Sequence, residues 1–178
     1  MQIFINLLTI SRILFGAIIF LLISMTNYYW LALSLFFIAG ITDYLDGYFA
    51  RKYNLVSEIG EILDPIADKI LIIFLFFGLS VSISSYYIAF IGSIIITREI
   101  WVGALRDFNA RNKKSAATKV TFLAKLKTTI QLFTISIYLF GLSINNMLML
   151  VFADIFLFIS LIVTLYTGYQ YTKNTFSN

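Results

Sequence analysis

Four aspartates are spaced so that they can act together: Asp43 and Asp46 in one segment, and Asp64 and Asp68 in the next. Residues three or four positions apart lie on one face of a helix, so each pair shares a face. The connection over residues 52–57 is short, which makes the two helices antiparallel neighbours. The two faces can then meet and bring the four carboxylates together.

Four neighbouring carboxylates cannot all stay ionised without counter-charge, because like charges raise one another's pKa. Two divalent cations would neutralise them. The chain has no histidine and no cysteine, so a metal site must use oxygen ligands, which favours Mg²⁺, Mn²⁺ or Ca²⁺. Two metal ions held in this way suit in-line phosphoryl transfer, because they polarise the phosphate and stabilise the leaving oxygen.

Small residues on the same faces, Gly47, Ala50 and Gly60, leave room for a ligand close to the backbone. Arg51 follows the first pair and can hold a phosphate through paired hydrogen bonds. The alternative interpretation is that the aspartates are solvated loop charges or helix caps. Asp64, which directly precedes a proline, has the position of such a cap.

The composition places these residues in a membrane protein. Hydrophobic residues make up 60% of the 178 positions and charged residues only 12%, about half the share found in soluble domains. The length predicts a single membrane-embedded domain over residues 1–178. The net charge of +4 fits lipid headgroups, anionic substrates and membrane topology, with no nucleic acid as partner.

The distribution of charge predicts the membrane-crossing elements. Uncharged stretches cover residues 13–42, 70–97 and 128–172, the last interrupted only by Asp154. Each has polar or turn-forming residues near its middle, at 26–28, 80–85 and 141–146. We therefore predict an all-α integral membrane fold of six transmembrane helices arranged as three hairpins.

The same distribution predicts the orientation. All 13 Lys and Arg residues fall on one side of such a fold, so both termini and the aspartates should face the cytoplasm. The first uncharged stretch allows about 13 residues for each arm, roughly 20 Å of helix against a hydrocarbon core of about 30 Å. The helices must therefore continue into the charged clusters. Charges at that depth are costly unless paired or metal-bound, which makes them functional candidates.

Asp154 is the one charge far from these clusters. Two interpretations remain open from the sequence. It pairs with another group at a helix or dimer interface, or it lies nearer the far membrane surface than its place in the stretch suggests.

The aspartate segments resemble the signature of the CDP-alcohol phosphatidyltransferase family. The pattern is D-x-x-D-G-x-x-A-R, eight residues, then G-x-x-x-D-x-x-x-D, and every fixed position is present here. The six-helix layout is also similar, so the resemblance extends over the whole chain. It implies that Asp43, Asp46 and Asp64 bind one metal ion, and that Asp43, Asp64 and Asp68 bind the other.

The resemblance also implies further roles. Asp68 would be the general base that accepts the proton of the acceptor alcohol. The CDP group would contact Gly47, Ala50, Arg51 and Gly60. Members of the family are usually homodimers, so a homodimer is expected.

A second charged cluster bears on the acceptor. Arg98 and Arg106 lie two helical turns apart, and Lys125 and Lys127 begin a later helix, so the four can form a basic pocket for an acceptor that carries a phosphate. The alternative is that each of these residues only sets the orientation of the chain in the membrane or binds lipid headgroups.

This cluster resembles the T-R-E-x-x-V-x-x-L-R and K-x-K-T-x-x-Q segments of the bacterial phosphatidylglycerophosphate synthases within that family. The resemblance implies CDP-diacylglycerol as donor, sn-glycerol 3-phosphate as acceptor, CMP as leaving group, and a bacterial cell membrane as location. The segment at Asn6, Thr9 and Arg12 is similar to the family's amino-terminal pattern, which implies that Asn6 and Thr9 border the nucleotide.

Other functions remain open from the residues alone. The same chemistry with another acceptor would use phosphatidylglycerol, giving cardiolipin, or inositol phosphate. Intramembrane aspartates are also found in divalent-cation transporters and in prenyltransferases. Against a transporter, the carboxylates gather near one side, and the single proline gives no sign of broken helices.

Overall fold

The computed structural model describes residues 2–52, 58–112 and 122–177. Side chains at 2–6, 8, 46, 50, 51, 58–62 and 124 lie outside the described part. The described residues form six long helices and no strand. The helices are α1 (Gln2–Leu21), α2 (Tyr29–Lys52), α3 (Glu58–Ser82), α4 (Tyr86–Arg111), α5 (Phe122–Ser143) and α6 (Met147–Phe176), with a short π-helix at Leu22–Thr26.

Three tight turns join the helices in pairs, as the sequence predicts. Asn27, Ser84 and Asn145 each adopt a left-handed backbone conformation, with φ of 56°, 52° and 51°, which ends the first helix of each pair. Ser85 and Asn146 then cap the next helices by accepting hydrogen bonds from backbone N–H groups. The predicted fold of three hairpins is therefore confirmed.

Five of the described helices, α1, α2, α3, α4 and α6, are long and apolar enough to cross a membrane. The chain is accordingly a multi-pass membrane protein. Helix α5 is of similar length but begins with a polar segment that contains Lys125, Lys127 and Gln131. Lys127 and Gln131 are buried, because α5 turns this polar face toward its neighbours.

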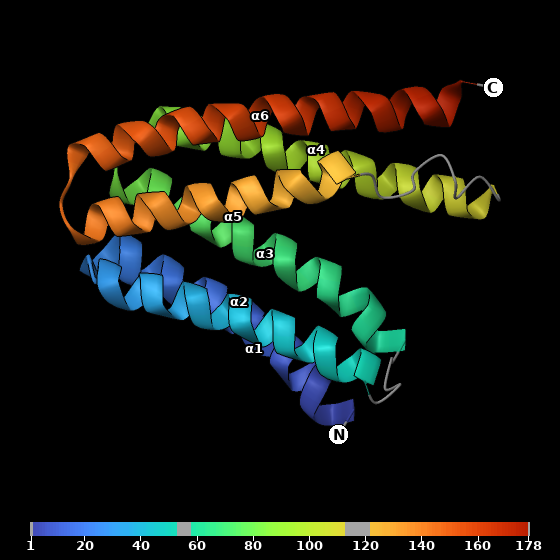
Figure 1. Ribbon diagram of the computed structural model, residues 1–178, viewed down its shortest axis with the longest axis horizontal. Helices are drawn as coiled ribbons and strands as arrows, with labels where there is room; N and C mark the ends of the chain where they lie inside the picture. The colour runs from blue at the N-terminus through green and yellow to red at the C-terminus, as the bar shows by residue number, and fades with distance from the viewer. Residues whose placement is uncertain (1, 53–57, 113–121, 178) are drawn as a thin grey trace.

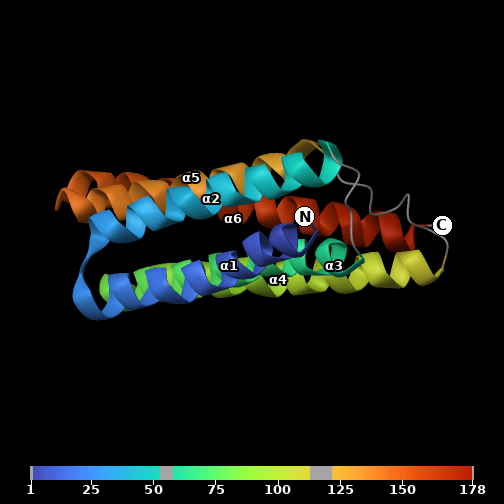
Figure 2. The ribbon, with the colours of Figure 1, turned by 90° about the horizontal axis from the view of Figure 1, so that it is seen from below.

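The three turns gather at one end of the bundle, and both termini lie toward the other (Figure 1). Seen from below, α2 and α5 lie on one side, while α1, α3 and α4 lie on the other (Figure 2). The core is apolar and densest near the turns, where Ile23, Leu79 and Leu139 are fully buried.

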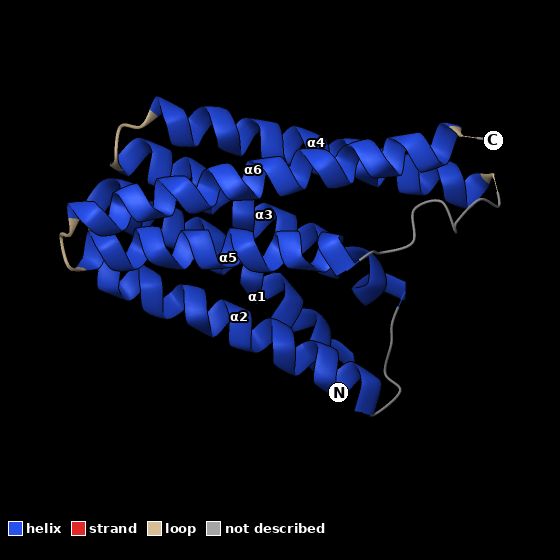
Figure 3. Cartoon of the chain, turned by 45° about the horizontal axis from the view of Figure 1, so that its top comes forward, coloured by secondary structure: helices blue, strands red, loops and turns tan. Residues whose placement is uncertain are grey.

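Toward the end with the termini, the helices separate into two groups. Helices α1, α2 and α3 run away from α4, α5 and α6, so that the bundle widens (Figures 1 and 3). The helices also continue into the charged clusters as expected, since α2 extends to Lys52 and α4 to Arg111. The charged residues with candidate roles therefore lie on helices at this wide end.

Asp154 lies within α6 and has partners in two other helices. Its Oδ1 accepts a hydrogen bond from the Tyr138 hydroxyl of α5 at 2.5 Å. Its backbone oxygen accepts one from the Tyr87 hydroxyl of α4 at 3.1 Å. Of the two interpretations of Asp154, pairing at a helix interface is the one observed.

Candidate active site

Three of the four predicted aspartates converge at the wide end of the bundle. Asp43 lies on α2, and Asp64 and Asp68 lie one turn apart on α3. Each side chain is about half exposed, at 51%, 47% and 50% respectively. The carboxylates are thus accessible to a ligand, while their backbones belong to packed helices.

Arg12 of α1 lies at the point where these carboxylates meet. Its Nη1 donates hydrogen bonds to Oδ1 of both Asp43 and Asp68, and its Nη2 donates to Asp64 at 3.3 Å. Because two of the oxygens share one nitrogen atom, Asp43 and Asp68 lie close to each other. The described parts of α2 and α3 do not pack directly against each other, which corrects the sequence prediction; α1 packs against both and joins them. The Arg12 side chain itself is 1% exposed, so it supplies a buried positive charge beneath the acidic groups.

Thr9 lies one helical turn before Arg12, on the same face of α1. Its hydroxyl donates a hydrogen bond to Oδ1 of Asp64 at 2.8 Å. Thr9, expected at the border of the nucleotide site, is therefore placed next to the acidic cluster. Helix α1 contributes two hydrogen-bond donors that orient carboxylates of α2 and α3.

The donor set fits a hard divalent cation in its chemistry, because it consists of carboxylate oxygens from two helices directed at one cationic position. Arg12 occupies that position here. Among the described side chains, no three acidic groups lie close enough together to share a metal ion. The carboxylates are thus arranged around a buried positive charge.

Several predicted site residues have side chains outside the described part: Asn6, Asp46, Ala50, Arg51 and Gly60. Their backbones belong to α1, α2 and α3. Gly47 is described and lies one turn after Asp43 on α2. Its place beside the acidic cluster agrees with the spacing that the sequence indicates.

The predicted basic cluster is built around Glu99 of α4. Arg98 donates to Oε1 of Glu99 at 3.0 Å, and Lys127 of α5 pairs with the same oxygen. The other arm of the Arg98 guanidinium donates to the Thr167 hydroxyl of α6 at 2.6 Å. Arg98 and Lys127 are each only 7% exposed in their side chains, so three helices share a buried network of charge.

Arg106 and Lys125 differ in their placement. Arg106 lies over the ring of Tyr171 with 5.7 Å between its guanidinium carbon and the ring centroid, and Arg98 lies 5.8 Å from the same centroid. These two arginines are therefore brought together by α6. Lys125 is exposed at the start of α5.

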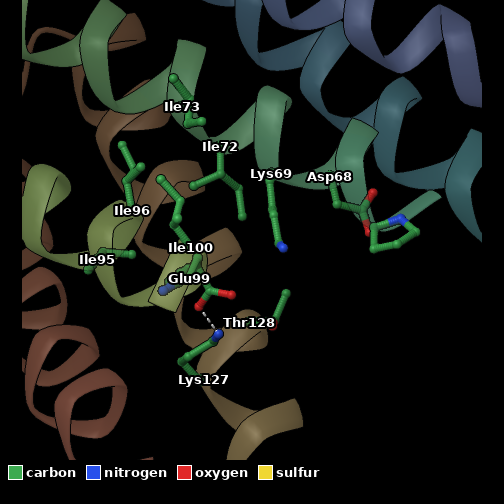
Figure 4. Close-up of a pocket in the computed structure, with 12 residues that line it drawn as sticks. Asp68, Lys69, Ile72, Ile73, Ile95, Ile96, Glu99, Ile100, Lys127 and Thr128 are labelled. Carbon is green, nitrogen blue, oxygen red and sulfur yellow. Dashed lines mark hydrogen bonds and ion pairs between the residues drawn. The ribbon is translucent and has the colours of Figure 1, made fainter. Parts of the chain in front are cut away.

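A cavity of about 180 Å³ connects the acidic and basic clusters. It lies between α3, α4 and α5, and its lining includes Asp68 at one side and Glu99, Lys127 and Thr128 at another (Figure 4). The remaining wall is apolar, formed mainly by isoleucines 72, 73, 95, 96 and 100. A small polar molecule in this cavity would lie between a carboxylate and an ammonium group.

Sequence reasoning missed two residues of this site. Arg12 was predicted only as part of a terminal pattern, although a charge between apolar stretches of one helix is itself a signal of function. Glu99 was given no role, because its spacing does not reveal that it faces both Arg98 and Lys127. That pairing depends on how α4 packs against α5.

Comparison with known proteins agrees with this geometry. Residues 3–166 match the family described as CDP-alcohol phosphatidyltransferase. A Rickettsia typhi protein named CDP-diacylglycerol–glycerol-3-phosphate 3-phosphatidyltransferase is 40% identical over 171 residues, which cover 94% of each chain. Proteins with the same name from Cereibacter sphaeroides and Haemophilus influenzae are 36% and 34% identical, over 80% and 78% of this chain and 65% and 74% of theirs.

Proposed function

Because this chain belongs to the CDP-alcohol phosphatidyltransferase family, we propose that it transfers the phosphatidyl group of CDP-diacylglycerol to sn-glycerol 3-phosphate. The products are phosphatidylglycerophosphate and CMP. The observation that carries the proposal is the 40% identity, over almost the full length of both chains, to a relative whose name states this reaction. The convergence of Asp43, Asp64 and Asp68 supports it, since phosphoryl transfer needs clustered charge at the reacting phosphate.

In the proposed reaction, the acceptor hydroxyl attacks the phosphorus atom of the phosphatidyl group. A new P–O bond forms, the phosphoanhydride bond breaks, and its electron pair leaves with CMP. Asp68 accepts the hydroxyl proton, a role supported by its half-exposed carboxylate at the edge of the cavity. Gly47, Ala50, Arg51 and Gly60 hold the CDP group, with Asn6 and Thr9 at its border.

The family uses divalent metal ions, and Asp43, Asp46, Asp64 and Asp68 are the residues that would hold two of them, Mg²⁺ or Mn²⁺. Bound there, the metal ions would supply Lewis-acid stabilisation of the charge that develops on the phosphate oxygens. Thr9 orients Asp64 for this task, and α1, which packs against both α2 and α3, keeps the carboxylates close together.

The basic cluster supports a phosphorylated acceptor. Arg98, Arg106, Lys125 and Lys127 provide four positive groups at the same end of the molecule as Asp68, and Lys127 lines the cavity that reaches it. Among the described acidic residues, only Glu99 pairs with members of this cluster, so an anionic phosphate gains from the excess of positive charge and an uncharged acceptor does not. We place the site, with both termini, on the cytoplasmic side of a bacterial cell membrane, and we expect a homodimer.

The decisive experiment measures CMP release from CDP-diacylglycerol by the purified protein with a panel of acceptors. Glycerol 3-phosphate should support turnover in the presence of Mg²⁺ or Mn²⁺, and a chelator should abolish it. Phosphatidylglycerol and inositol phosphate should support little. Turnover with either of these, and none with glycerol 3-phosphate, would refute the acceptor and retain the reaction class.

A further inference from the structure

Lys69 occupies a distinctive position in the cavity between α3, α4 and α5. It directly follows Asp68 on α3, so its side chain leaves the helix at a different angle. In Figure 4 its ammonium group points into the space between Asp68 and the Glu99–Lys127 pair. A Cβ atom built at Gly103 would lie 3.6 Å from the Lys69 Nζ, an ordinary van der Waals distance, so the ammonium group lies against α4.

The ammonium group of Lys69 has no hydrogen-bond or ion-pair partner among the described residues. The other cations of this region differ in this respect. Arg98 and Lys127 both bind Oε1 of Glu99, and Arg98 also donates to Thr167. Lys69 is therefore the cation of the cavity whose hydrogen-bonding capacity remains available to a ligand.

The charges around the cavity are positive in sum. Its lining carries Lys69 and Lys127 against Asp68 and Glu99. Arg98 binds Glu99 from outside the lining, which leaves one net positive charge in the group. A phosphate monoester, with roughly −1.5 to −2 charges near neutral pH, is attracted to the end of the cavity that carries Lys69 and Lys127. The apolar isoleucines of the cavity wall lower the local dielectric constant, and this strengthens a hydrogen bond between ammonium and phosphate.

We propose that Lys69 binds the phosphate of the acceptor alcohol, together with Lys127, while Asp68 faces the acceptor's hydroxyl group. Adjacent residues of one helix would then hold the two ends of a small phosphorylated alcohol. Their separation selects an acceptor whose hydroxyl and phosphate are a few bonds apart. This inference rests on the proposed function and assigns to it a residue outside the predicted basic cluster.

The test compares Lys69→Met and Lys69→Arg with the wild-type protein in assays of CMP release. The loss of a charge-assisted hydrogen bond should raise KM for glycerol 3-phosphate by about 10- to 100-fold in Lys69→Met. KM for CDP-diacylglycerol should stay within about twofold, as expected for a residue that contacts only the acceptor. Lys69→Arg, which keeps the charge, should recover part of the acceptor affinity. Lys173→Met, at an exposed site near the end of α6, should leave both KM values unchanged.

A second variant addresses the position of the ammonium group without changing its charge. Gly103→Val fills the space that Lys69 Nζ contacts, so it should also raise KM for glycerol 3-phosphate selectively. If Lys69→Met is active and its KM for glycerol 3-phosphate equals that of the wild-type protein, the inference is overturned and the proposed function still stands. Absence of acceptor-dependent CMP release in the wild-type protein would instead refute the proposed function itself.

Discussion

Asp68 combines two features that a general base for this reaction requires. Its carboxylate lies within the acidic cluster through Arg12, and it also lines the cavity that extends to Lys127. Asp68→Asn preserves size and removes the proton-accepting oxygen. We expect the rate of CMP release to fall by about 10²- to 10⁴-fold. Asp107→Asn, on the exposed surface of α4, is the matched control and should retain wild-type activity. Comparable activity in both variants would remove Asp68 from the mechanism.

Arg12 should influence the protein's response to metal ions. Arg12→Gln removes the buried cation that three carboxylates share, so their mutual repulsion is no longer compensated. Without divalent ions, the unfolding temperature in detergent should fall by about 5–10 °C. Saturating Mg²⁺ should then raise it more in this variant than in the wild-type protein. Arg111→Gln, which lies exposed at the end of α4, should respond as the wild-type protein does. An equal Mg²⁺ response in Arg12→Gln would argue against competition for the same oxygens.

The residue scale is also where the sequence was least informative. The spacing of Asp43, Asp64 and Asp68 predicts their convergence but gives the wrong reason for it. Direct packing of α2 against α3 was expected, whereas α1 packs against both helices and its Arg12 binds the three carboxylates. Arg12 and Glu99 could not be assigned in this way, since their partners belong to helices that are distant in sequence. Lys69 is adjacent to Asp68, yet its place in the cavity depends on how α3 packs against α4 and α5.

Among the elements, α6 controls the position of Arg98. A Cβ atom built at Gly168 would lie 3.0 Å from Cγ and 3.1 Å from Nε of Arg98. Arg98 cannot easily move, because its guanidinium is held by Glu99 and Thr167. Gly168→Ala should therefore destabilise the protein by about 1–3 kcal/mol and lower its unfolding temperature by several degrees.

Gly40 on α2 provides the matched control. A Cβ atom built there has no neighbour within 4 Å, so Gly40→Ala gains the helix propensity of alanine without a clash. Its unfolding temperature should stay the same or rise slightly. A similar effect of both substitutions would show that Arg98 is free to adjust.

The helices and their turns were accessible from the sequence for a clear reason. Polar residues in the middle of an apolar stretch mark the turn, and Asn27, Ser84 and Asn145 adopt the left-handed conformation at those places. Hydropathy is less informative for α5, because Gln131 bonds to Thr164 of α6 and Lys127 to Glu99 of α4. Polar groups that bond to neighbouring helices lower the mean hydropathy of a helix, although that helix still packs within the bundle.

The orientation of the whole molecule can be tested directly, because the chain has no native cysteine. Single cysteines at Tyr86, beside the second turn, and at Lys173, near the carboxyl terminus, lie at opposite ends of the bundle. The excess of positive charge at the termini predicts that this end faces the cytoplasm. Tyr86→Cys should react with a membrane-impermeant maleimide in intact cells. Lys173→Cys should react only after permeabilisation, and the reverse pattern would invert the proposed topology.

The widening of the bundle toward the termini has a consequence for how two unlike reactants meet. The proposed donor is a lipid of the bilayer and the proposed acceptor is water-soluble, so neither the membrane nor the water contains both reactants. The acidic side chains at this wide end are half exposed, so the ionic reactant can reach them without crossing hydrocarbon. The lipid can arrive sideways from its own leaflet. The proposed site thus lies at the boundary of membrane and water, where the acidic groups can meet both reactants.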